Sequence, residues 1–107
     1  MSQLTVERVM ILVRDVFQLK VGKAKDAKAL FKEAAELAKK YSMPVGRALT
    51  DLTGTYYTFV WESTYPSLTD WEKAMNDPRG ADEWGAWYQK FAPLIDGGHR
   101  EIMTIVE

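Results

Sequence analysis

The segment from residue 8 to residue 21 restricts the fold of this chain more than any other feature. It alternates as a β-strand does, but apolar side chains occupy both of its faces. Such a pattern is typical of a strand that is buried on two sides. We therefore predict a strand from Arg8 to Val21 that is covered on both faces. One face carries Val9, Ile11 and Val13, and the other carries Met10, Leu12 and Val16.

Beyond Gly22 apolar residues recur about every 3.6 residues instead of about every 2 residues, which indicates a helix from Lys23 to Tyr41. Its residues have high helix propensity, and no glycine interrupts them. The opposite face carries mostly lysine and glutamate, and we interpret it as a solvated face. The apolar stripe consists of Ala27, Leu30, Phe31, Ala34, Leu37, Ala38 and Tyr41.

Two β-rich runs follow the predicted helix and flank Gly54. They cover residues 47–53 and 55–64, and a short turn at the glycine would join them as an antiparallel hairpin. Alternation places Tyr57, Phe59 and Trp61 on one face of the second run.

The next region has the spacing of a helix in two pieces. Residues 68–76 and 81–94 have helical patterns, and Pro78 interrupts them. Ser67 resembles an N-cap for the first piece. Because glycines loosen the start of the second piece, we hypothesise that residues 77–87 form a movable lid over a pocket.

A strand from His99 to Val106 follows Gly97-Gly98 and completes the order β-α-β-β-α-β. We therefore predict a single α+β domain over residues 1–107, ferredoxin-like, with a four-stranded antiparallel sheet and both helices on one face. The first, third and fourth strands keep apolar residues on both faces. A second copy packed on the open face would cover them, so we expect a homodimer that pairs as a dimeric α/β barrel.

Composition excludes several kinds of chemistry. The chain has no cysteine, which excludes disulfides, iron–sulfur clusters and cysteine-ligated zinc. Its one histidine cannot form a multi-histidine metal site, and we expect no metal and no cofactor. No apolar run is long enough to span a membrane and no secretory signal is visible, so we expect a cytoplasmic protein without a membrane partner.

The RNA-recognition fold has the same element order and needs a separate test. Its third-strand signature places a basic residue and glycine ahead of alternating aromatics. This chain has Thr55-Tyr56 at those positions and Glu62 in place of the last aromatic. With a net charge of −1 as well, we expect no nucleic-acid partner.

Three short patterns accompany this element order: Tyr57-x-Phe59-x-Trp61-Glu62, Ser67-Leu68-Thr69-Asp70-Trp71 and Asn76-Asp77-Pro78. Together they resemble the dimeric α/β-barrel superfamily, and more narrowly its NIPSNAP and antibiotic-biosynthesis-monooxygenase type. The resemblance implies a homodimer with a small-molecule pocket in each subunit, between the sheet and the split helix. Some members oxidise aromatic polyketides without a metal or flavin, and others degrade haem. The haem-degrading members share an asparagine on the first strand, which this chain lacks, so the resemblance does not extend to haem degradation.

Two residues are candidates for catalysis. His99 can act as a base near neutral pH toward a phenolic substrate, and Tyr57 is the second candidate. The alternative for His99 is a solvated residue in a turn after the two glycines.

Five further residues are candidates for contact with a substrate, and four of them are aromatic. A flat ligand can be held between the aromatic side chains and the sheet. Core packing and a dimer seam are the alternative for these positions. The charged candidate can clamp a substrate or form an interfacial salt bridge that fixes the register of a dimer. The five are Arg14, Trp61, Trp71, Trp84 and Tyr88.

We interpret the chain as a small-molecule-binding protein whose partners are a second copy of itself and a small apolar or aromatic molecule. Its fold would support cofactor-independent monooxygenation of an aromatic or apolar substrate. The alternative is a non-enzymatic dimer that binds a metabolite or serves in assembly.

Overall fold

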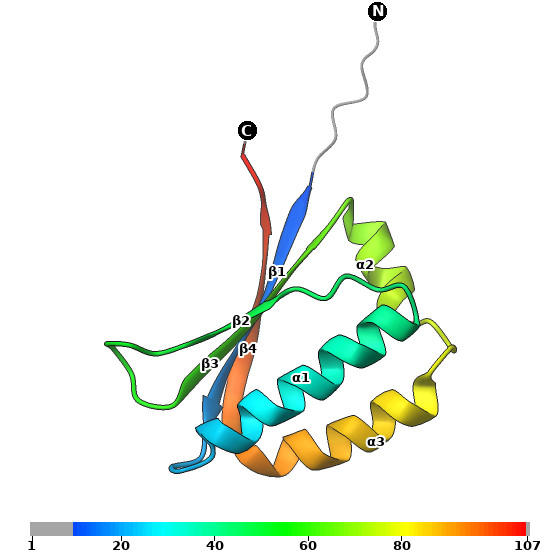
Figure 1. Cartoon of the computed structure of the whole chain (residues 1–107). Coiled ribbons are helices and arrows are strands. Elements are labelled where there is room, and N and C mark those ends of the chain that lie inside the picture. Colours follow the sequence, from blue (N-terminus) through cyan, green and yellow to red (C-terminus); the bar gives the residue numbers. More distant parts are fainter. Residues whose placement is uncertain (1–9, 107) are drawn as a thin grey trace, which may run out of the picture.

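The computed structural model describes residues 10–106, which form one four-stranded antiparallel sheet with all helices on one face (Figure 1). The strand order is β2-β3-β1-β4. This arrangement confirms the predicted ferredoxin-like α+β fold. Arg8 and Val9, the beginning of the predicted first strand, lie outside the described residues. In chain order the elements are β1 (Ile11–Leu19), α1 (Ala24–Lys40), β2 (Arg47–Thr50), β3 (Thr58–Tyr65), α2 (Leu68–Met75), α3 (Ala81–Phe91), a 3₁₀ turn (Ala92–Leu94) and β4 (Ile95–Thr104).

β1 lies between β3 and β4 and has two different faces. Side chains on one face pack under the helices, and those on the other face point to the open side of the sheet. The alternation predicted from the sequence is therefore confirmed over the described residues. The helix-covered face carries Ile11, Val13, Asp15, Phe17 and Leu19, and the open face carries Leu12, Arg14, Val16 and Gln18.

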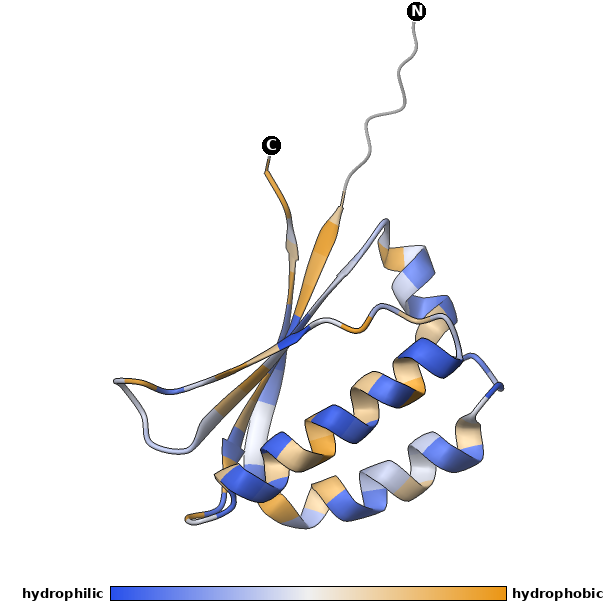
Figure 2. Cartoon of the chain, in the orientation of Figure 1, coloured by the Kyte–Doolittle hydropathy of each residue, from blue (hydrophilic) through white to orange (hydrophobic). Residues whose placement is uncertain are grey.

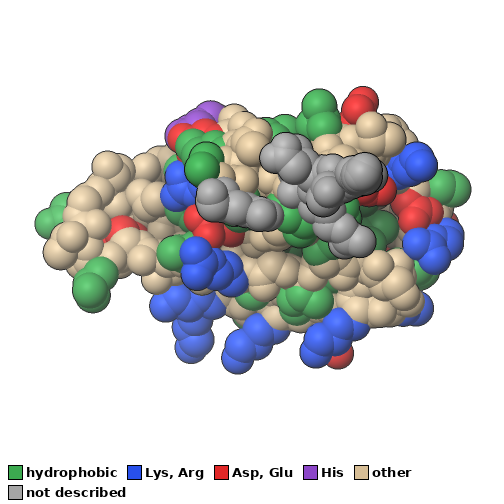
Figure 3. Space-filling model, turned by 90° about the horizontal axis from the view of Figure 1, so that it is seen from above, with side chains coloured by type: hydrophobic (Ala, Val, Ile, Leu, Met, Phe, Trp, Pro, Cys, Tyr) green, Lys and Arg blue, Asp and Glu red, His purple; other side chains and the backbone are tan. Residues whose placement is uncertain are grey.

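The core lies between the sheet and the pair α1 and α3. α1 buries four residues of its predicted stripe, Ala27, Leu30, Ala34 and Ala38, and its lysines are exposed. Hydrophobic and hydrophilic residues alternate along this helix (Figure 2). Basic side chains gather along one long side of the molecule (Figure 3). Trp87 joins the two helices, because its indole N–H donates to the carbonyl oxygen of Leu30 at 2.7 Å. Its ring stacks on Phe91 with the centroids 5.0 Å apart.

The connection between β2 and β3 is longer than predicted. β2 ends at Thr50 and β3 begins at Thr58, so the expected short turn at Gly54 was wrong. Side chains close the loop instead of a tight turn: Asp51 Oδ1 accepts a hydrogen bond from the backbone N–H of Thr58 at 3.0 Å. The Thr58 hydroxyl donates to the carbonyl of Thr55 at 2.9 Å.

β4 begins earlier than predicted, at Ile95 instead of His99. Gly97 and Gly98 belong to this strand and lie opposite Gln18 and Phe17 of β1, so they do not end the preceding helix. A Cβ at Gly98 would collide with the carbonyl oxygen of Val16. The glycine therefore permits a close approach of two backbones, next to an irregularity in the β1–β4 register.

The open face of the sheet combines apolar and charged side chains. Glu62 is buried even in the single chain, with 8% of its side chain exposed, and accepts hydrogen bonds from Arg14 Nε and Arg47 Nε, each at 2.8 Å. Arg14 Nη1 also donates to Glu101 at 2.7 Å, and His99 Nε2 lies 2.9 Å from the other oxygen of Glu101. Apolar residues flank this network: Leu12, Val16, Leu49, Val60 and Met103.

Among the described helices none is long and apolar enough to cross a membrane.

Candidate functional site

A cavity of about 360 Å³ lies between the helix-covered face of the sheet and the helices. β1, β3 and β4 form its floor, and the C-terminal end of α1, α2 and α3 form its walls. Aromatic side chains form a large part of its lining. These side chains include Phe17, Trp61, Trp71, Trp84, Trp87 and Tyr88.

The strand register places Asp15 in the middle of this floor. Its direct neighbour on β3 is Trp61, and its direct neighbour on β4 is Arg100. Phe17 and Val13 follow on either side along β1. A carboxylate is thus held among apolar and aromatic groups on the covered face, where a charge requires a partner.

Arg100 is that partner. Its Nε donates to Asp15 Oδ1 at 2.6 Å, and its guanidinium carbon lies 5.2 Å from the ring centroid of Trp71. Tyr65, on β3, is buried close to this ion pair. Burial raises the pKa of the Tyr65 hydroxyl, the negative charge of Asp15 raises it further, and Arg100 opposes both effects. The hydroxyl therefore stays protonated at neutral pH, as a polar group that neither gains nor loses charge.

α2 lies at the edge of the cavity and begins with a side-chain cap. Ser67 Oγ accepts a hydrogen bond from the backbone N–H of Asp70 at 3.1 Å, which confirms the predicted N-cap. α2 buries none of its residues completely, and it is anchored through Trp71 and Ala74, which pack against the end of the sheet. This wall of the cavity is consequently the one with the fewest buried contacts.

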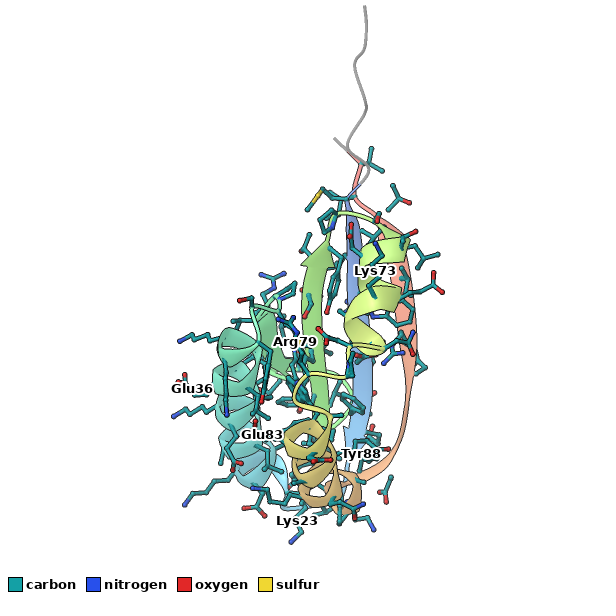
Figure 4. All side chains as sticks on the ribbon, turned by 90° about the vertical axis from the view of Figure 1, so that its right-hand side faces the viewer. Lys23, Glu36, Lys73, Arg79, Glu83 and Tyr88 are labelled. Carbon is teal, nitrogen blue, oxygen red and sulfur yellow. The ribbon has the colours of Figure 1, made fainter. Side chains whose placement is uncertain are left out.

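The first turn of α3, with the connection that precedes it, is fastened to the end of α1. The Tyr41 hydroxyl hydrogen-bonds to the carboxylate of Glu83, and Lys40 Nζ lies 3.0 Å from the same group. The Tyr41 hydroxyl and Lys40 hold the pKa of Glu83 below its ordinary value. Arg79, in the connection, and Glu83, in the first turn of α3, both lie on the side that faces α1 (Figure 4).

Arg79 completes this fastening from within the connection. Its guanidinium pairs with the carboxylate of Asp77 at 2.8 Å and donates to the Tyr41 carbonyl at 3.1 Å. The pairing lowers the pKa of Asp77, which therefore lines the cavity as a carboxylate that is already compensated. Gly80 adopts a positive φ of 71°, and the Tyr41 ring fills the space where a Cβ would lie.

The structure brings four of the seven candidate residues to the cavity, namely Trp61, Trp71, Trp84 and Tyr88. Tyr88 projects from α3 on the side of β4 (Figure 4).

The other three candidates do not line the cavity. Arg14 and His99 belong to the open face of the sheet, on its opposite side. Tyr57 precedes β3 with a positive φ of 58° and packs against the helix-side core.

The sequence interpretation missed Asp15 and Arg100 as cavity residues. The position of Asp15 follows from alternation alone, because it shares the parity of Val13 and Phe17. Arg100 had no such signal, because its place beside Asp15 depends on a strand pairing across 85 residues.

Neither a known family profile nor a curated protein matches this sequence. Solved structures do resemble the fold. A NIPSNAP family protein of unknown function from Agrobacterium tumefaciens has a TM-score of 0.81 at 17% identity, covering 94% of this chain and 91% of that one. A second NIPSNAP family protein from the same organism has a TM-score of 0.80, also at 17% identity, with 96% and 91% covered.

A putative antibiotic biosynthesis monooxygenase from Nitrosomonas europaea is similar to this chain with a TM-score of 0.66 at 15% identity, covering 95% of this chain and 93% of that one. At these identities the similarity shows a shared fold, which is the fold predicted by the resemblance.

Proposed function

We propose that this protein binds a small planar aromatic molecule in the cavity between its sheet and its helices, and that it does so as a homodimer. The observation that carries the proposal is the cavity itself, of about 360 Å³, with aromatic walls and one ion pair on its floor. Cavities of this size and composition are typical of small-molecule sites.

The aromatic side chains are arranged to accept a flat ring. Trp61 and Trp84 each meet Trp87 edge to face, with centroid distances of 5.7 and 5.9 Å. Their remaining faces and edges offer a ligand the offset and T-shaped contacts that aromatic pairs prefer. Such contacts contribute about 0.5–1.5 kcal/mol each beyond the burial of apolar area.

A pair of helix variants tests binding. Ala74 lines the cavity, whereas Ala86 on α3 is exposed. We expect Ala74→Phe to fill the cavity and weaken the binding of 2-naphthol at least tenfold in a calorimetric titration. Ala86→Phe should bind as the wild type does, with thermal melts showing that both variants fold. Equal binding by both variants, or no binding by the wild type, would refute the proposal.

The homodimer is proposed from the open face of the sheet. Apolar side chains and an almost buried glutamate lie on a face that no element of the described chain covers. A second copy would bury them, and the network around Glu62 would fix the register. Native mass spectrometry should therefore report a dimer, together with any molecule retained from the cell.

Introducing a charge on that face gives the matched test. Val16 lies near the centre of the open face, and Val21 is 82% exposed beyond the end of β1. We expect Val16→Lys to give a monomer and Val21→Lys to leave the dimer intact. A monomeric wild type would remove this part of the proposal.

Cofactor-independent monooxygenation is the second candidate, because Asp15 supplies a carboxylate beside the bound ring. A substrate that loses a proton becomes electron-rich enough to react with dioxygen directly. One oxygen atom then replaces two hydrogens of the substrate and the other leaves as water, so no further reductant is required. Oxygen uptake with a panel of phenols and quinols, lost in Ala74→Phe, would support this activity. If ligands that bind cause no oxygen uptake, the proposed monooxygenation is refuted and the proposed binding stands.

A further inference from the structure

The charges around the cavity cancel one another. Three charged side chains line it within residues 10–106: Asp15, Asp77 and Arg100. Asp77 is compensated by Arg79, and Asp15 and Arg100 compensate each other. The cavity consequently has no positive or negative charge to spare for an ion.

The pair on the floor nevertheless has hydrogen-bonding capacity left. The bond between them uses one carboxylate oxygen of Asp15 and Nε of Arg100. Within the described chain Asp15 Oδ2 accepts no hydrogen bond, and the two Nη nitrogens of Arg100 donate none. The side chains of Asp15 and Arg100 are 24% and 45% exposed, so neither side chain is sealed by protein. A free acceptor and free donors therefore lie side by side on the floor of an aromatic cavity.

We propose that the ligand is an uncharged aromatic molecule with a hydrogen-bond donor and an acceptor on neighbouring atoms, as in an aromatic 1,2-diol. This inference rests on the proposed binding function and specifies the ligand class of the same site. One ligand hydroxyl donates to Asp15 Oδ2, and the adjacent oxygen accepts from an Nη nitrogen of Arg100. Hydrogen bonds to charged partners are the stronger kind, so both contribute to selectivity.

The same pair rejects ligands with a net charge. An aromatic carboxylate has only acceptors, so it suits Arg100 but faces the Asp15 carboxylate without a donor. It would also bring an uncompensated charge into a partly desolvated site. An aromatic ammonium meets the opposite difficulty, because it suits Asp15 but faces the Arg100 guanidinium. Selection against both ions is specificity by repulsion as well as by attraction.

Titration calorimetry with probes that share one ring system tests this selection. The probes are 2,3-dihydroxynaphthalene, 2-naphthol, 2-naphthoate and 2-naphthylmethylammonium, each at neutral pH with the wild-type protein. We expect the diol to bind at least tenfold more tightly than either ion, with 2-naphthol in between.

Two substitutions should redirect the preference. Asp15→Asn leaves Arg100 uncompensated, and we expect 2-naphthoate to gain at least fivefold in affinity while the diol loses affinity. Arg100→Gln leaves Asp15 uncompensated and should favour the ammonium in the same way. Asp26→Asn is the matched control, because it removes one carboxylate from the exposed start of α1, outside the cavity. It should leave the wild-type order unchanged.

The outcomes separate the two proposals. If all four probes bind the wild type within threefold of one another, or if either ion binds best, the assigned ligand class is wrong while binding in the cavity stands. If Asp15→Asn and Asp26→Asn change the order equally, the role assigned to the ion pair is wrong. If no probe binds the wild type, the proposed function itself fails. Should one substituted protein not fold, the wild-type order and the other substitution still decide the inference.

Discussion

Replacing Glu62 by glutamine tests whether the charge network on the open face stabilises the fold. The carboxylate is 8% exposed and accepts hydrogen bonds from Arg14 and Arg47, each at 2.8 Å. A hydrogen bond to a charged group contributes about 1.5–3 kcal/mol. In Glu62→Gln one oxygen remains as a neutral acceptor, and the amide nitrogen faces a guanidinium with which it cannot bond. We expect the free energy of unfolding to fall by about 2–3 kcal/mol, and the melting temperature to fall by about 10 °C.

The loss should depend on pH. The Arg14 hydrogen bond, followed by that of Arg47, holds the pKa of Glu62 below its ordinary value of 4.5. A carboxyl whose folded pKa is lowered contributes stability that is complete above the unfolded pKa. That contribution is lost as the pH falls through the folded pKa. The difference between wild type and Glu62→Gln should therefore be largest near pH 7 and shrink below pH 4.5.

Urea unfolding followed by tryptophan fluorescence, at pH 7 and near pH 4 and at a single protein concentration, measures both effects. Glu36→Gln is the matched control. It removes the surface pair with Lys39, in which the two side chains are 75% and 65% exposed, and such pairs contribute little. A loss that is equal at both pH values, or as large in Glu36→Gln, would refute the reasoning.

Four further substitutions have definite expectations. Gly46→Ala should lower the free energy of unfolding by about 2–4 kcal/mol, because φ is +74° and a Cβ would collide with β3. Gly54→Ala has open space around it and should lower the free energy of unfolding clearly less in the same urea titration. Tyr41→Phe removes the hydroxyl bonded to Glu83 and should speed amide exchange at the start of α3 and in the connection before it, with little change in melting temperature; unchanged exchange would refute the fastening. Trp87→Phe loses a buried hydrogen bond to an α1 carbonyl and should cost about 2 kcal/mol, and a neutral result would show that the bond contributes nothing.

The order of elements was predictable because its signals are local. The stripe of α1 and the alternation of β1 depend only on the spacing of neighbours along the chain, and both are confirmed. The ends of elements were less predictable. The loop after β2 is closed by Asp51 reaching Thr58, and Gly98 lies within β4 because of its contact with Val16. Both depend on tertiary neighbours that spacing does not reveal.

In the candidate site too, residues with a local sequence signal were predictable, and those that depend on strand pairing were not. Tryptophans at helical spacing on α3 indicated an aromatic wall, and Trp84 and Trp87 do line the cavity. Arg14 is the charged residue that the sequence suggested for substrate contact, although its neighbour Asp15 is the one on the covered face. Sequence alone did not reveal that Arg100 would compensate Asp15, because the pairing of β1 with β4 is needed to see it.

The central position of β1 also affects how the protein is made. β1 is the first strand of the described chain, yet its partner β4 is synthesised about 80 residues later. At about 5–20 residues per second, ribosomes leave one edge of β1 unpaired for several seconds. During that time a nascent strand with apolar side chains on both faces is available to other chains. Production of this protein should therefore be sensitive to chaperone supply and to the rate of translation through the segment that precedes β4.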